Sequence, residues 1–150
     1  MLALRANRDF TAKGAAEFAG AVVQLVGLTP MDADLPLFLQ QATSGNAADQ
    51  VGKVVGRGGM ASTAGSASLW GGQYIVESHT ADETVVLVMF TPLTNGVTET
   101  NAEGKTHQVV LDVVLNHTRD GWVLSNLGGV TAAQETAIVS PQANKFKGAC

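Results

Sequence analysis

The two halves of the chain differ in the spacing of their hydrophobic residues. In the first half, apolar side chains recur about every three to four positions, as in amphipathic helices. The second half holds runs rich in Val, Leu and Ile, which are typical of β-strands: Tyr74 to His79, Val85 to Thr91, Gln108 to Asn116 and Trp122 to Leu127. This order predicts an α+β fold, with N-terminal helices packed on a curved, mostly antiparallel sheet of about four to five strands.

Local capping signals place three helices in the first half. Thr11 is expected to cap the first helix, which Gly27 ends. Asp32 is expected to cap a short second helix, and Asn46 the third. Gly56 is expected to end the third helix.

The strand region begins after a glycine-rich stretch. Arg57 to Gly72 is predicted to be a loop with one weak strand from Met60 to Ala67. Ala81-Asp82 is predicted to form a hairpin turn. Val85 to Phe90 is apolar on both faces and is therefore expected to be a central strand covered on each side. Thr94 to Lys105 is polar and is expected to be an exposed connection.

Residues 1–150 are expected to form a single domain with its core at about residues 10–130. The segment from Thr131 to Cys150 is predicted to be a polar tail with a short helix around Ala132 to Ile138. One cysteine can form neither an intramolecular disulfide nor a cysteine metal site. We therefore interpret Cys150 as an exposed terminal residue, with an intermolecular disulfide or a tether as the alternative.

Composition narrows the function classes. Hydrophobic residues make up 45% of the chain and charged residues 15%, a balance that argues against disorder. The net charge is −4 and the nine Lys and Arg residues are scattered, which argues against nucleic acid and against a basic membrane-binding face. No apolar run is long enough for a membrane span or a signal peptide. We expect membrane attachment only through an upstream anchor outside this chain.

The last predicted hairpin carries a family resemblance. The stretch Arg119-Asp120-Gly121-Trp122-Val123-Leu124-Ser125, after several helices and a hairpin, resembles the NTF2-like superfamily. This cone-shaped fold is shared by nuclear transport factor 2, ketosteroid isomerases and many accessory domains. Lys13-Gly14-Ala15-Ala16, the Tyr74 to Phe90 hairpin and this final hairpin also resemble actinobacterial extracytoplasmic domains of that fold. Such domains occur in Mce-associated proteins and in conjugation and secretion systems.

An enzyme of this fold would need a polar catalytic group inside the cone. Asp112 is the candidate, because it interrupts an apolar strand on the same face as Val110 and Val114. A desolvated carboxylate there would have a raised pKa and could act as a general base. The alternative is that Asp112 is solvated or pairs with a Lys or Arg. Ketosteroid isomerases also need a Tyr and a protonated acid as donors, and Tyr74 is the sole tyrosine.

The remaining polar and aromatic residues give no catalytic motif. His79, His107 and His117 lie at predicted strand ends without metal-ligand spacing, so we expect no metal site and no cofactor. Trp70 is expected to be buried, and its exposure would instead mark a ligand or partner surface. We therefore retain Trp70 and Tyr74 as candidates for such a surface.

Three functions remain open. The leading hypothesis is a non-enzymatic NTF2-like accessory domain of an envelope, transport or conjugation assembly, with protein partners and self-association through the outer face of its sheet. The second is a small-molecule enzyme or binder of the ketosteroid isomerase type. The third is a virion or other assembly subunit. The resemblance implies an extracytoplasmic location.

Overall fold

The computed structural model describes residues 10–59 and 65–147. Its helices are α2 (Ala12–Gly27), α3 (Leu35–Ala42), α4 (Gly45–Arg57) and α5 (Ala132–Ile138), and its strands are β1 (Gly65–His79), β2 (Glu83–Thr94), β3 (Val97–Thr98), β4 (Val109–Thr118), β5 (Gly121–Gly128) and β6 (Asn144–Lys145). The ladders between these strands are antiparallel, in the order β5-β4-β2-β1-β6, with β3 beside β2. The α+β prediction is confirmed. The described sheet has six strands rather than four to five because two-residue strands, β3 and β6, join the four long ones.

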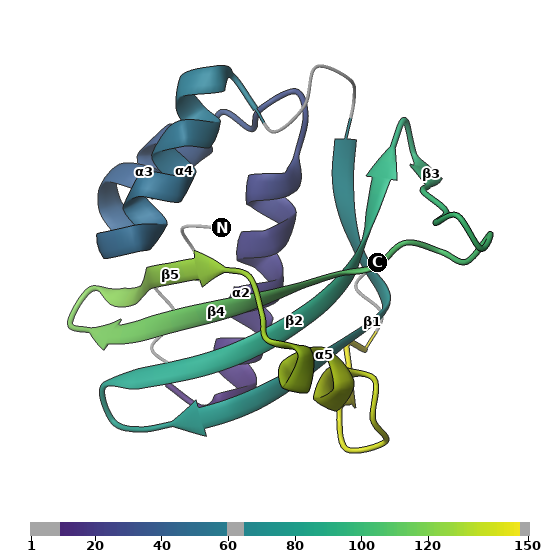
Figure 1. Ribbon diagram of the computed structural model, residues 1–150. Coiled ribbons are helices and arrows are strands. Elements are labelled where there is room, and N and C mark those ends of the chain that lie inside the picture. The colour runs from purple at the N-terminus through teal and green to yellow at the C-terminus, as the bar shows by residue number, and fades with distance from the viewer. Residues whose placement is uncertain (1–9, 60–64, 148–150) are drawn as a thin grey trace.

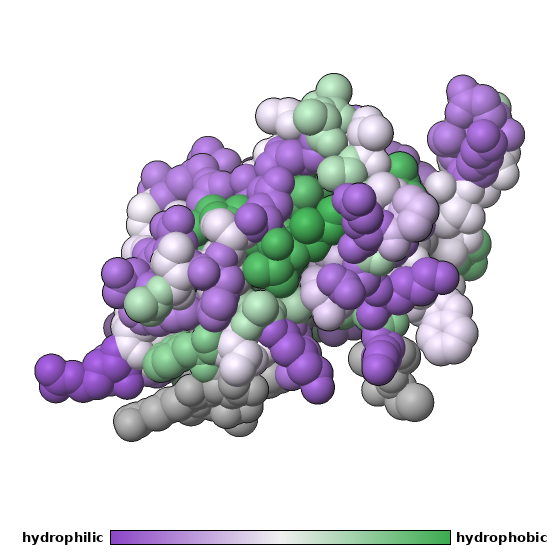
Figure 2. Space-filling model, turned by 90° about the horizontal axis from the view of Figure 1, so that it is seen from below, coloured by the Kyte–Doolittle hydropathy of each residue, from purple (hydrophilic) through white to green (hydrophobic). Residues whose placement is uncertain are grey.

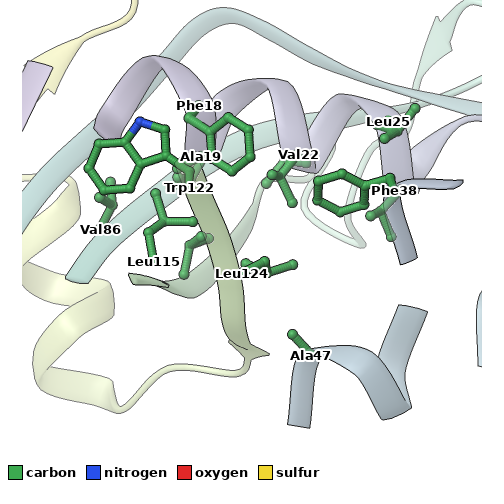
Figure 3. Packing of buried hydrophobic residues seen from close by; sticks show 14 of the residues in the cluster. Phe18, Ala19, Val22, Leu25, Phe38, Ala47, Val86, Leu115, Trp122 and Leu124 are labelled. Carbon is green, nitrogen blue, oxygen red and sulfur yellow. The ribbon is translucent and has the colours of Figure 1, made fainter. Parts of the chain in front are cut away.

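The three N-terminal helices cover one face of the sheet (Figure 1). Helix α2 packs on β1 and β2, whereas α3 and α4 lie against β5. Figure 3 shows Phe18 and Val22 of α2 beside Trp122, Leu115 and Leu124 of the sheet. These side chains belong to the main hydrophobic cluster, which also contains buried residues of α3 and α4. The apolar face of each N-terminal helix therefore points into this cluster.

Helix boundaries show where local signals suffice and where they do not. The Thr11 cap is confirmed, because Gly14 N–H donates to Thr11 Oγ1 at 3.0 Å. The Asn46 cap is wrong: α4 begins at Gly45, and the Asn46 amide instead donates to Asn126 Oδ1 at 2.6 Å. Asp32 does not cap α3 either, since its carboxylate accepts from Asp34 N–H before the helix begins.

One of the two predicted helix ends is confirmed and the other is shifted. Helix α2 ends at Gly27 as predicted. Helix α4 continues past Gly56 to Arg57, and Gly58 takes the left-handed conformation that closes it. A glycine with positive φ commonly closes a helix, and in α4 this glycine comes two residues later than expected.

Strand β1 takes up the second half of the predicted loop, from Gly65 to Gly72. The expected strand from Met60 to Ala67 lies partly outside the described residues, but from Gly65 the chain is paired with β2. The pairing shifts between Ser68 and Gln73, where a bulge holds Gly71 and Gly72, two of the glycines that indicate a loop. Bulges bend a strand and increase its twist, and Figure 1 shows β1 and β2 curving around α2.

The opposite face of the sheet carries α5. Leu87 and Met89 of β2 and Ile138 of α5 form a second, smaller cluster there. The prediction that β2 is covered on both sides is therefore confirmed. Helix α5 spans the predicted Ala132–Ile138, but the C-terminal segment is more than a polar tail, because Ile138 is fully buried and Phe146 packs on the main cluster.

Candidate functional site

An apolar pocket lies between the N-terminal helices and the sheet. It has a volume of about 200 Å³ and opens to solvent. Its lining comes from two N-terminal helices and the sheet: Val23 and Val26 of α2, Val54 of α4, Phe90 of β2, Leu111 of β4 and Leu127 of β5. Gln50 of α4 is the polar residue in the described lining. This pocket can hold a small apolar group, but its described lining offers no acid, base or nucleophile.

Asp112 lies on the other face of the sheet. It is paired with Leu87 on β2 and with Gly128 on β5, and Leu87 belongs to the cluster under α5. Because side chains alternate along a strand, Leu111 points into the apolar pocket and Asp112 points away from it. The predicted face, shared with Val110 and Val114, is thus correct, but this face is not the one that the N-terminal helices cover. The ketosteroid isomerase hypothesis therefore lacks its base in this pocket.

The environment of Asp112 disfavours its charged form. Burial raises the pKa of the Asp112 carboxyl above its ordinary value of 3.8, and the nearby Glu77 carboxylate raises it further. Asp112 Oδ1 is buried without a hydrogen-bond partner among the described residues. A carboxylate in such a place weakens the fold when it is ionised.

We expect the Asp112→Asn variant to be more stable than the wild type at pH 7. The raised pKa means that the folded state binds the Asp112 proton more tightly than the unfolded chain does. This stabilisation is complete below pH 3.8 and is lost as the pH rises through the folded-state pKa. Urea unfolding from pH 3 to pH 8 should therefore show a gap between variant and wild type that opens with rising pH.

Asp49→Asn is the matched control, because Asp49 is exposed on α4. Its effect should stay within about 0.5 kcal/mol at every pH. An Asp112→Asn variant that is less stable than the wild type at pH 7 would show that the carboxylate has a stabilising partner.

Two histidines share one buried hydroxyl. Thr84 Oγ1 lies 2.8 Å from His79 Nδ1 and 3.1 Å from His117 Nε2, and His117 Nδ1 lies 2.8 Å from the Ala81 carbonyl oxygen. A carbonyl oxygen can only accept a hydrogen bond, so Nδ1 of neutral His117 carries the proton and donates to the Ala81 carbonyl. His117 Nε2 then accepts from the Thr84 hydroxyl. The Thr84 oxygen in turn accepts from His79 Nδ1. Thr84 is fully buried, and its hydroxyl already serves as a hydrogen-bond donor and as an acceptor. This hydroxyl is therefore not a free nucleophile.

This network confirms that His79 and His117 are satisfied strand-end histidines. Phe10 stacks on the His117 ring at 4.8 Å, which further fixes that ring. Across residues 10–59 and 65–147, no group of three or more His, Cys, Asp or Glu side chains is placed to hold a metal ion.

Trp70 is exposed, contrary to the expectation of burial. It is 79% exposed and follows the bulge position Ser68, whose Oγ accepts from Trp70 N–H at 3.2 Å. The bulge takes Trp70 out of the ladder register, so that its neighbour Leu69 is buried instead. Trp70 therefore meets the condition under which it would mark a ligand or partner surface.

Tyr74 is partly buried, and its ring lies 4.9 Å from that of Phe146. Trp70 and Tyr74 lie on either side of the Gly71–Gly72 turn of the bulge and do not share one pocket. Tyr74 lines a second, basic hollow together with Lys13, Lys145 and Lys147. Sequence reasoning missed these lysines, although the Lys145-Phe146-Lys147 alternation was a signal for a short paired strand.

Comparison with protein-family models, with curated proteins and with solved structures finds no match for this chain. Within the described ranges, no helix is both long and apolar enough to cross a bilayer.

Proposed function

We propose that this chain is a non-enzymatic interaction domain of the NTF2-like type, an extracytoplasmic accessory module of an envelope, transport or conjugation assembly. Helices on one face of a bent antiparallel sheet support the family likeness. The separation of Asp112 from the apolar pocket favours binding over catalysis. The assembly named here rests on the resemblance alone.

The observation that carries the proposal is the exposed Trp70 beside a free strand edge. On its outer side β1 is bridged to Thr29 at Gly65 and paired with β6 at Gln73 and Tyr74. Between these contacts, Ser66 to Trp70 have no neighbouring strand among the described residues, although Trp70 N–H donates to Ser68 Oγ. Native sheets normally protect such edges. Tryptophan is also among the residues that contribute most to protein interfaces.

A second copy of the chain is the partner that fits this edge. Antiparallel pairing of β1 with β1 of another copy is an isologous contact, in which each Trp70 can pack on the partner's sheet. Hydrophobic surface is open to solvent elsewhere too: Figure 2 shows apolar residues near the middle of one side, ringed by hydrophilic ones. Self-association would remove part of such surface from water.

Light scattering after size-exclusion chromatography tests this proposal. We expect a concentration-dependent dimer for the wild type and a dimer dissociation constant at least about tenfold higher for Trp70→Ser, because a central tryptophan contributes more than about 1.4 kcal/mol. Val97→Ser is the matched control, since Val97 is 66% exposed on β3, away from the bulge. A monomer at every concentration would contradict self-association, and large closed or open oligomers would favour the assembly-subunit alternative.

A small-molecule binder is the second candidate, favoured by the apolar pocket of about 200 Å³. An apolar fluorescent probe that binds saturably, and equally to the wild type and to Trp70→Ser, would show binding away from the Trp70 edge, as a binder using this pocket requires. If that binding occurs without any dimer, the binder replaces the interaction domain as the better proposal.

A further inference from the structure

A basic hollow lies between the first half of α2 and the segment that follows α5. It has a volume of about 540 Å³, within the range of about 300–1,000 Å³ that is usual for small-molecule sites. Lys13 and Glu17 of α2 line one side, and Lys145 and Lys147 the other. Segments far apart in the sequence therefore build one site.

Positive charge is concentrated at this hollow compared with the rest of the chain. The whole chain has a net charge of −4 and only nine Lys and Arg residues, yet three of those nine line the hollow. Glu17 is the acid in the described lining, and its carboxylate lies 3.8 Å from Lys13 Nζ with both side chains largely exposed. Such an exposed pair is weak, so the lysines retain an attraction for an anion from solution.

The inner wall is aromatic and held in place by the backbone. The Tyr74 and Phe146 rings lie 4.9 Å apart at 48°. Phe146 N–H donates to the Gly72 carbonyl at 3.1 Å, and β6 pairs with β1 next to it. Phe146 also lies against the bare backbone of Gly20, where an added Cβ would come within 3.1 Å of its ring. The wall therefore offers fixed aromatic surface for the flat part of a ligand.

We propose that this hollow binds a small anion attached to a flat ring, of the aryl phosphate or aryl carboxylate class. Lysine ammonium groups bind phosphate and carboxylate oxygens as point charges. Lys145 and Lys147 flank Phe146 in the sequence, and all three residues line the hollow. The bound anion takes over from Glu17 as the counter-ion of Lys13.

Titration calorimetry with phenyl phosphate, inorganic phosphate and phenol tests both halves of this site. We expect phenyl phosphate to bind more tightly than inorganic phosphate, and phenol not to bind measurably. Affinity for phenyl phosphate should fall as salt is raised from about 0.01 M to 0.15 M, because screening shortens the reach of the lysine charges. Equal binding of phenyl phosphate and inorganic phosphate would overturn the role of the aromatic wall.

Charge-neutral variants assign the binding to this hollow. We expect Lys145→Gln to weaken phenyl phosphate binding about fivefold, whereas Glu17→Gln should strengthen it by removing the competing carboxylate. Lys105→Gln changes the net charge equally but lies outside the hollow, on the exposed connection, and should leave the affinity unchanged. Thermal melts confirm that each variant is folded.

If Lys145→Gln and Glu17→Gln both bind phenyl phosphate like the wild type, the binding does not occur in this hollow and the proposal is wrong. This outcome is separable from failure of the Trp70 edge, because none of the three substitutions lies between Ser66 and Trp70. The dimer measured by light scattering should be the same for all three.

Discussion

Replacing Trp122 by alanine is expected to lower the free energy of unfolding by about 3–5 kcal/mol. Trp122 is 1% exposed and lies where three other rings meet: His117 at 4.3 Å, Phe10 at 5.3 Å and Phe18 at 6.3 Å. Figure 3 shows it against α2, at the junction of that helix with the sheet. Removing the indole leaves a cavity that neither layer can close, so the loss is a large share of the roughly 5–15 kcal/mol typical of a domain.

The other tryptophan is the natural control. Trp70 is 79% exposed, so Trp70→Ala should change the free energy of unfolding by no more than about 0.5 kcal/mol in the monomer. Urea denaturation of both variants, followed by circular dichroism, measures the difference. If Trp122→Ala does not fold, Trp122→Phe should still show a smaller loss. Equal losses at Trp122 and Trp70 would contradict the packing described here.

Replacing Gly72 by alanine is expected to cost about 1–3 kcal/mol or more. An added Cβ would lie 2.5 Å from the Met89 carbonyl oxygen and 3.0 Å from that of Leu69. Both contacts are to backbone, so no side chain can rotate away, and the β1–β2 ladder itself must shift. Since β1 and β2 form the longest ladder of the sheet, the strain falls on the part of the fold that has the most pairing.

Gly56→Ala is the comparison variant. Gly56 is exposed near the end of α4 and has no atom within 4 Å of its added Cβ. Alanine there should stabilise the protein by about 0.4–1 kcal/mol, because it reduces the freedom of the unfolded chain. Thermal and urea unfolding of both variants should thus move in opposite directions. A neutral Gly72→Ala would mean that the bulge can open without cost.

Local sequence signals predicted the elements whose stabilising groups lie within a few residues. Thr11 accepts a hydrogen bond from the residue three positions on, so its capping role is visible in the sequence. The turn at Ala81-Asp82 and the α5 segment Ala132–Ile138 were also predicted, because their polar residues satisfy nearby backbone groups. Continuous apolar character placed Val85 to Phe90 at the centre of the sheet.

The errors arose where a distant partner decides the structure. Asn46 has the chemistry of a helix cap, but Asn126, 80 residues away, binds its side chain. The glycines between Gly65 and Gly72 look like a loop, and only pairing with β2 makes them a bulged strand. Asp112 was placed on its correct face, but the sequence cannot tell which face the N-terminal helices cover.

The sequence by itself determined the α+β class and the antiparallel hairpins, because hydrophobic period and turn chemistry are local properties. Pairing and packing across the chain set the rest: the bulge that exposes Trp70, the side of the sheet on which Asp112 lies, and the hollow that joins Lys13 to Lys145 and Lys147. Those features depend on contacts between residues separated by tens of positions. A one-residue change of register would move each side chain to the opposite face.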